Sequence, residues 1–178
     1  MSSEEHFLSE LFPLLGNDET VVVPPGDDCA VYAVPGSDLL QIVALDQVIE
    51  NRHYTPETPA RAVGRKLLAR NLSDIAAMGG VPRYALISSA SSMNTTEEWL
   101  KEFHLGIIEL AREHGVFIIG GDIAKTPQDS VASLTIIGEQ KREEILSQKN
   151  ISPKDFLCAT GEFGNSFLSE HHLHFSPR

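Results

Sequence analysis

Two stretches of the chain, residues 59–78 and 95–114, place apolar residues at the three- and four-residue spacing of an amphipathic helix. The first opens on Pro59, which suits the first turn of a helix, and is followed by Gly79, a common stop residue. The second begins at a threonine able to cap it and ends at Gly115. The pattern therefore predicts two long helices.

Shorter runs of β-branched and other apolar residues predict strands, at residues 21–23, 29–34, 39–45, 83–90, 116–119 and 131–137. The turn sequence PGSD at 35–38 joins two of these runs and indicates a hairpin. Residues 46–58 are polar and predict an irregular segment. Since hairpins are mixed with two long helices, the pattern predicts an α+β fold.

The two ends of the chain add less regular elements. Ser2 and Glu5 have the spacing of a capping box, which predicts a short helix to about residue 15. After a polar connector at 141–153, an apolar run at 156–159 and the sequence GEFGNSF predict a strand, a turn and the start of a helix. We interpret the chain as one domain, residues 1–150, followed by the truncated start of a second, residues 151–178.

Composition narrows the classes of function. The chain has 178 residues, 42% of them hydrophobic, which is enough for a packed core. Its formal net charge of −11 argues against a nucleic-acid-binding protein, because phosphate neutralisation needs clustered lysine and arginine. The same charge is compatible with nucleotide binding, because Mg²⁺ can bridge acidic side chains and phosphate oxygens.

Cysteine content and hydropathy bear on location. The two cysteines, Cys29 and Cys158, are too few for a disulfide framework and favour a reducing compartment. The first residues, MSSEEHFLSELF, are acidic where a signal peptide would be basic. No apolar stretch approaches the roughly 18 residues of a membrane span. We therefore expect a soluble, cytoplasmic protein without a membrane partner.

Isolated aspartates stand at or near the predicted ends of strands and helices, each among residues expected to be buried: Asp27, Asp28, Asp46, Asp74 and Asp122. Two carboxylates about 4 Å apart repel by about 4 kcal/mol at an effective dielectric near 20, so a cluster of them requires cations. Oxygen donors without histidine and cysteine at zinc spacing favour Mg²⁺. We expect the carboxylates of Asp28, Asp46, Asp74 and Asp122 to face one cleft. The alternative is that each is an ordinary turn, cap or helix residue.

Several motifs resemble, in order and spacing, those of the thiamine-monophosphate kinase family within the aminoimidazole ribonucleotide synthetase superfamily. The matching segments are GDDCAVY at 26–32, ENRHY at 50–54, NLSDIAAMGGVP at 71–82, IIGGD at 118–122 and SPKDFLCATGEFGNS at 152–166. The resemblance covers nearly the whole chain. It implies the fold of the N-terminal domain of aminoimidazole ribonucleotide synthetase, a mixed sheet with two long helices. In that superfamily such sheets form a barrel across a two-fold axis, which implies a homodimer.

The resemblance also implies an activity. It implies direct in-line transfer of the γ-phosphoryl group of ATP to thiamine monophosphate, giving thiamine diphosphate, with several Mg²⁺ ions held by aspartates. Position by position, it makes Asp28, Asp46, Asp74 and Asp122 metal ligands with Asp27 beside them. It makes Gly121 and Asp122 contacts for ATP and His53 a contact for thiamine monophosphate. No residue is assigned as catalytic, since phosphoryl transfer depends on positioning and charge neutralisation more than on an enzymic nucleophile.

The chain also departs from the family pattern. Residues that are usually small and hydroxylated, or that contact ATP as arginine, are replaced by Ala44, Leu45, Ile123, Ala124 and Gln148. Two alternatives therefore stay open. One is a related ATP-using enzyme with another acceptor, and the other is a catalytically silent nucleotide-binding homologue. Since the family's second domain supplies further contacts, we expect the 178-residue chain alone to be inactive.

Overall fold

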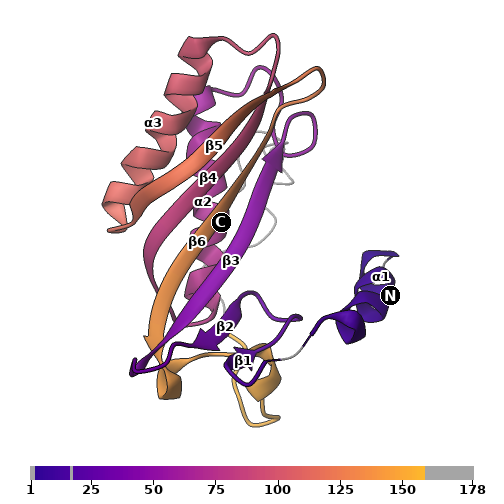
Figure 1. The fold of residues 1–178 in the computed structure, drawn as a ribbon, viewed down its shortest axis with the longest axis vertical. Helices are drawn as coiled ribbons and strands as arrows, with labels where there is room; N and C mark the ends of the chain where they lie inside the picture. The colour runs from indigo at the N-terminus through magenta and orange to yellow at the C-terminus, as the bar shows by residue number, and fades with distance from the viewer. Residues whose placement is uncertain (1–2, 17, 159–178) are drawn as a thin grey trace.

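The computed structural model describes residues 3–16 and 18–158. The fold is a six-stranded mixed sheet with two long helices packed against one face (Figure 1). The strands are β1 (Val21–Val23), β2 (Ala30–Ala33), β3 (Leu39–Ile49), β4 (Val81–Ser92), β5 (Phe117–Thr126) and β6 (Val131–Lys141). They lie in the order β1-β2-β3-β6-β4-β5. Neighbouring strands are antiparallel, except for the parallel pair β4 and β5. The predicted α+β class and hairpin are confirmed.

Both long helices are present at the predicted places, as α2 (Ala60–Ala77) and α3 (Glu97–Glu113). Pro59 precedes α2, and the Thr96 hydroxyl accepts a hydrogen bond from the Trp99 N–H at 3.1 Å to cap α3. A third helix, α1 (Ser3–Leu11), lies to one side of the sheet (Figure 1). The predicted capping residue Ser2 lies outside the described residues. None of the helices in the described ranges is long and apolar enough to cross a membrane.

The core lies between the sheet and α2. Alternate residues of the strands point toward the helix, and Ile42, Leu134 and Ile136 are completely buried there. Leu67 and Ile75 of α2 are completely buried against them. Side chains at alternate strand positions and side chains on one face of α2 therefore pack together in one apolar layer.

Helices α2 and α3 cross backbone to backbone at two glycines. A Cβ atom added to Gly64 would lie 1.9 Å from the Phe103 carbonyl oxygen, and one added to Gly106 would lie 2.0 Å from the Arg61 carbonyl oxygen. Such distances are far below van der Waals contact, so this crossing requires glycine at both positions.

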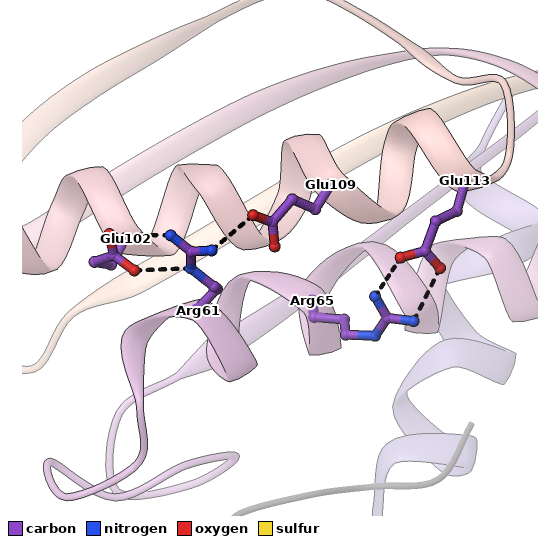
Figure 2. A network of polar contacts seen from close by, with 5 residues as sticks. All are labelled: Arg61, Arg65, Glu102, Glu109 and Glu113. Carbon is purple, nitrogen blue, oxygen red and sulfur yellow. Dashed lines mark hydrogen bonds and ion pairs between the residues drawn. The ribbon is translucent and has the colours of Figure 1, made fainter.

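Ion pairs join the solvent side of the same two helices (Figure 2). Arg61 donates to Glu102 at 2.8 Å and to Glu109 at 2.7 Å, and Arg65 makes two hydrogen bonds to Glu113 at 2.8 and 3.0 Å. These side chains are exposed and their attraction is screened by salt. They therefore fix the relative register of the helices more than they stabilise the domain.

Strands β3, β4, β5 and β6 all extend past their predicted ends, and the extensions of β3 and β5 carry two aspartates of the candidate site. Strand β3 continues from Leu45 to Ile49 because all eleven of its residues pair with β6, so the prediction of an irregular segment from residue 46 was wrong there. Strand β5 continues from Ile119 to Thr126 in parallel pairing with β4. Consequently Asp46 and Asp122 lie inside strands, where the sequence had predicted strand ends.

The C-terminal segment differs as well. The described part of the predicted strand at 156–159 pairs with no other strand, and Phe156 and Leu157 are fully exposed. The GEFGNSF turn lies outside the described residues.

The sheet face away from the helices is apolar and open. The side chains of Leu45, Tyr84, Leu86 and Phe117 are 66%, 46%, 39% and 68% exposed, and the strand registers place all four on this face. Both α2 and α3 pack on the opposite face. An apolar surface of this extent is typical of an interface with another protein.

Candidate functional site

An acidic turn, formed by Asp27 and Asp28, lies between β1 and β2. The connector after β6 folds back onto it. The Ser147 hydroxyl donates to Oδ2 of Asp27 at 2.6 Å, and the Gln148 backbone N–H donates to the same oxygen at 3.2 Å. The Gln148 side chain donates from Nε2 to Oδ2 of Asp28 at 3.0 Å. The connector is thereby brought against two predicted metal ligands.

Asp74 approaches the same region from the last turns of α2. Cys29, which follows the acidic turn, is only 3% exposed. The pKa of its thiol is raised to about 12, mainly by burial and then by the negative charges of Asp74, Asp28 and Asp27, in that order. Three of the five predicted metal ligands are therefore near enough to act electrostatically on one buried thiol.

We expect the two cysteines to differ sharply in reactivity. At pH 8 the Cys29 thiol stays protonated because its pKa of about 12 lies far above the pH, and burial blocks reagent access. Cys158 is exposed and should react at once with a disulfide reagent. A Cys158→Ser variant should show no fast-reacting thiol until it is unfolded in guanidinium. Fast labelling of the folded variant would contradict the buried environment described for Cys29.

Asp46 is held by an arginine of α2. Its Oδ2 accepts from Nε of Arg70 at 2.6 Å and its Oδ1 from Nη2 at 2.8 Å. The two side chains are only 20% and 24% exposed. Asp46 pairs in register with the buried Leu134, which places it on the helix-covered face of the sheet. A partly buried, two-bonded pair of this kind holds both side chains in one orientation.

His53 lies beside this pair in the turn that follows β3. Its Nδ1 accepts the Ile49 N–H at 3.0 Å, and its carbonyl oxygen accepts from Nζ of Lys66 at 2.6 Å. Burial lowers the pKa of the imidazole, and the positive charges of Arg70 and Lys66 lower it further. His53 is therefore a neutral imidazole near pH 7, with Nδ1 fixed as an acceptor.

Asp122 lies on the other face of the sheet. It pairs in register with Ser88 of β4, which pairs with Ser133 of β6, so these side chains form a polar row across the open face. A shallow pocket of about 270 Å³ covers this row and includes Gly121. A Cβ atom at Gly121 would lie 2.1 Å from the Ile87 carbonyl oxygen, so glycine is also required by the β4–β5 contact.

The five aspartates do not form one cluster within this chain. Asp46 faces the helices and Asp122 the open face, so the expectation that both would enter one cleft was wrong. Among the residues that the structure describes, no three His, Cys, Asp or Glu side chains are close enough to hold a metal ion together. A Mg²⁺ centre with all five ligands therefore does not fit a single copy of this chain.

Sequence reasoning missed Arg70 and Ser147. The pairing of Arg70 with Asp46 spans 24 residues, and that of Ser147 with Asp27 spans 120. Neither pair has a local spacing signal.

A larger hollow of about 480 Å³ at the other end of the strands, lined by Glu50, Tyr54 and Trp99 among others, contains none of the predicted site residues.

Comparison with known proteins gives one family match. Residues 26–140 match the family model described as AIR synthase related protein, N-terminal domain. The chain is 34% identical to a thiamine-monophosphate kinase of Bacillus subtilis over 168 residues, 92% of this chain and 50% of that protein. The chain spans about half the length of the curated relatives it matches.

Comparison with solved structures supports the same fold. A thiamine-monophosphate kinase from Stenotrophomonas maltophilia superposes with a TM-score of 0.58 at 31% identity, over 77% of this chain and 42% of that chain. A structure described as AaThiL complexed with AMPPCP and TMP superposes with a TM-score of 0.70 at 24% identity, over 83% of this chain and 46% of that chain.

Proposed function

This chain belongs to the AIR synthase related family, whose N-terminal domain it carries, and on that basis we propose that the protein phosphorylates thiamine monophosphate with ATP. The observation that carries the proposal is the 34% identity to a thiamine-monophosphate kinase across 92% of the chain. A structural relative in complex with AMPPCP and TMP supports the same two substrates. The products would be thiamine diphosphate and ADP, by direct in-line transfer.

The site residues support distinct roles in this proposal. Asp27, Asp28 and Asp74 offer the oxygen donors that Mg²⁺ prefers, and we propose Mg²⁺ as the cation that accompanies ATP. Gly121 and Asp122 would contact the nucleotide. His53 would contact thiamine monophosphate, and its neutral ring offers Nε2–H as a hydrogen-bond donor.

We propose a domain boundary near residue 150. The family match ends at residue 140, and the last 3-10 helix of the described residues, Gln148–Asn150, ends at Asn150. Residues 1–150 would be the nucleotide-binding domain and 151–178 the start of a second. A cytoplasmic location is part of the proposal and is supported by the two free cysteines.

The open face of the sheet supports a homodimer in which two sheets meet as a barrel. Leu45 is 66% exposed at its centre, beside the polar row that contains Asp122. A dimer through this face would bury both. Asp122 would then lie at the interface between two protomers. In that position its carboxylate could contribute to a site that also contains residues of the partner protomer.

We expect Leu45→Asp to abolish dimer formation, because it places two charges in the apolar interface. Sedimentation velocity at micromolar concentration should show a dimer for the wild type and a monomer for the variant. Leu14→Asp is the matched control, since Leu14 is 81% exposed outside the sheet. A monomeric wild type, or an unchanged dimer in Leu45→Asp, would contradict the proposed interface.

The activity is tested with the protein in its full natural length. Incubation with ATP, MgCl₂ and thiamine monophosphate, followed by chromatography, should show thiamine diphosphate and ADP in equal amounts. Binding of ATP without turnover would instead indicate a silent nucleotide-binding homologue. ADP formation only with another acceptor would indicate a related enzyme of the superfamily.

A further inference from the structure

Asp46 is one of the aspartates that the sequence predicts as candidate metal ligands, yet both of its carboxylate oxygens accept hydrogen bonds from Arg70. The pair is three-quarters or more buried, so solvent screens it only in part. Its geometry is the two-bonded fork that arginine forms with a carboxylate and that lysine cannot reproduce.

We propose that Arg70 withholds Asp46 from divalent cations, so that the guanidinium takes the place that a metal ion would otherwise have at this carboxylate. A cation that binds Asp46 must first displace two charge-assisted hydrogen bonds. The inference rests on the proposed function only in taking Asp46 as a candidate ligand. It makes Arg70 a determinant of metal affinity in this chain.

The surroundings of the pair support this assignment. Lys66, a residue that is only 6% exposed, lies on the same side of the sheet and donates from its ammonium group to the His53 carbonyl oxygen. The charges of Arg70, Lys66 and Arg52 all act on the His53 ring, against one negative charge from Asp46. Arg70 exerts the largest of these charge effects, so its removal would lower the positive charge that a cation at Asp46 meets, whereas the charges that act on Cys29 from Asp27, Asp28 and Asp74 are negative.

The test measures Mn²⁺ affinity by electron paramagnetic resonance on the purified chain, with no nucleotide or acceptor present. Arg70→Met should bind Mn²⁺ roughly 10- to 100-fold more tightly at Asp46, the range expected from releasing charged hydrogen bonds. Adding Asp46→Asn to Arg70→Met should abolish the gain. Arg65→Met is the matched control, because it removes the same charge from α2 at another two-bonded pair, with Glu113, and should leave Mn²⁺ affinity unchanged.

Circular dichroism establishes whether each variant is folded. If Arg70→Met does not fold, Arg70→Lys decides, since it keeps the charge but loses the fork and should show a smaller gain. An unchanged affinity in the folded variant, a gain that survives Asp46→Asn, or an equal gain in Arg65→Met would each overturn the proposal. Because no kinase assay is involved, failure of the proposed activity and failure of this inference are distinguishable.

Discussion

Gly64→Ala should lower the free energy of unfolding by about 3 kcal/mol or more, and so leave little folded protein. The added methyl group would lie 1.9 Å from the Phe103 carbonyl oxygen, and a backbone atom in the middle of a helix cannot move aside as a flexible side chain can. The helices would have to separate, which would break the ion pairs that Arg61 of α2 makes with Glu102 and Glu109 of α3. Gly106→Ala should have a similar effect, since its Cβ atom would lie 2.0 Å from the Arg61 carbonyl oxygen.

Thermal and urea unfolding monitored by circular dichroism measure this effect. Gly16→Ala is the matched control, because a Cβ atom there meets nothing within 4 Å, and its stability should equal that of the wild type within experimental error. A Gly64→Ala protein as stable as the control would show that the helix crossing is wider than described.

Asp122→Asn should reduce kcat/KM for thiamine diphosphate formation by about 100-fold or more while the protein stays folded. The variant keeps the shape of the side chain and removes its charge, and loss of one group that stabilises a phosphoryl-transfer transition state typically costs this much. Asp122 is exposed on the open face, so its replacement breaks no core contact.

The measurement is steady-state kinetics on the full-length protein. Asp38→Asn, in the exposed bend before β3, changes the same functional group away from the site and should retain full activity. Activity of Asp122→Asn within a few-fold of the control would remove Asp122 from the proposed nucleotide site.

Most of the secondary structure could be predicted from the local sequence pattern, because apolar spacing and helix caps are features of neighbouring residues. Apolar spacing, Pro59 and the Thr96 cap are sufficient to define α2 and α3 within two residues. The ends of the strands were harder to predict. Whether Asp46 continues β3, or Gly120 continues β5, depends on a partner strand that is distant in sequence.

The length of the strands in turn determined on which face of the sheet the candidate site residues lie. Because β3 runs past Leu45, the alternation of side chains turns Asp46 toward α2 and Arg70. In β5 the same alternation turns Asp122 to the open face, beside Ser88. The motifs identify which aspartates are candidates for chemistry, but a motif contains no information about which face of a sheet a residue will occupy.

The amino-acid sequence by itself determined the α+β class, the two long helices, the hairpin and the family, because these follow from periodicity, caps and motif spacing. Only the tertiary structure decided that α2 and α3 meet at Gly64 and Gly106, and that Arg70 neutralises Asp46. It also divided the aspartates between two faces of the sheet. These features depend on contacts between residues far apart in the chain, whose distances are set only when the sheet and helices pack together.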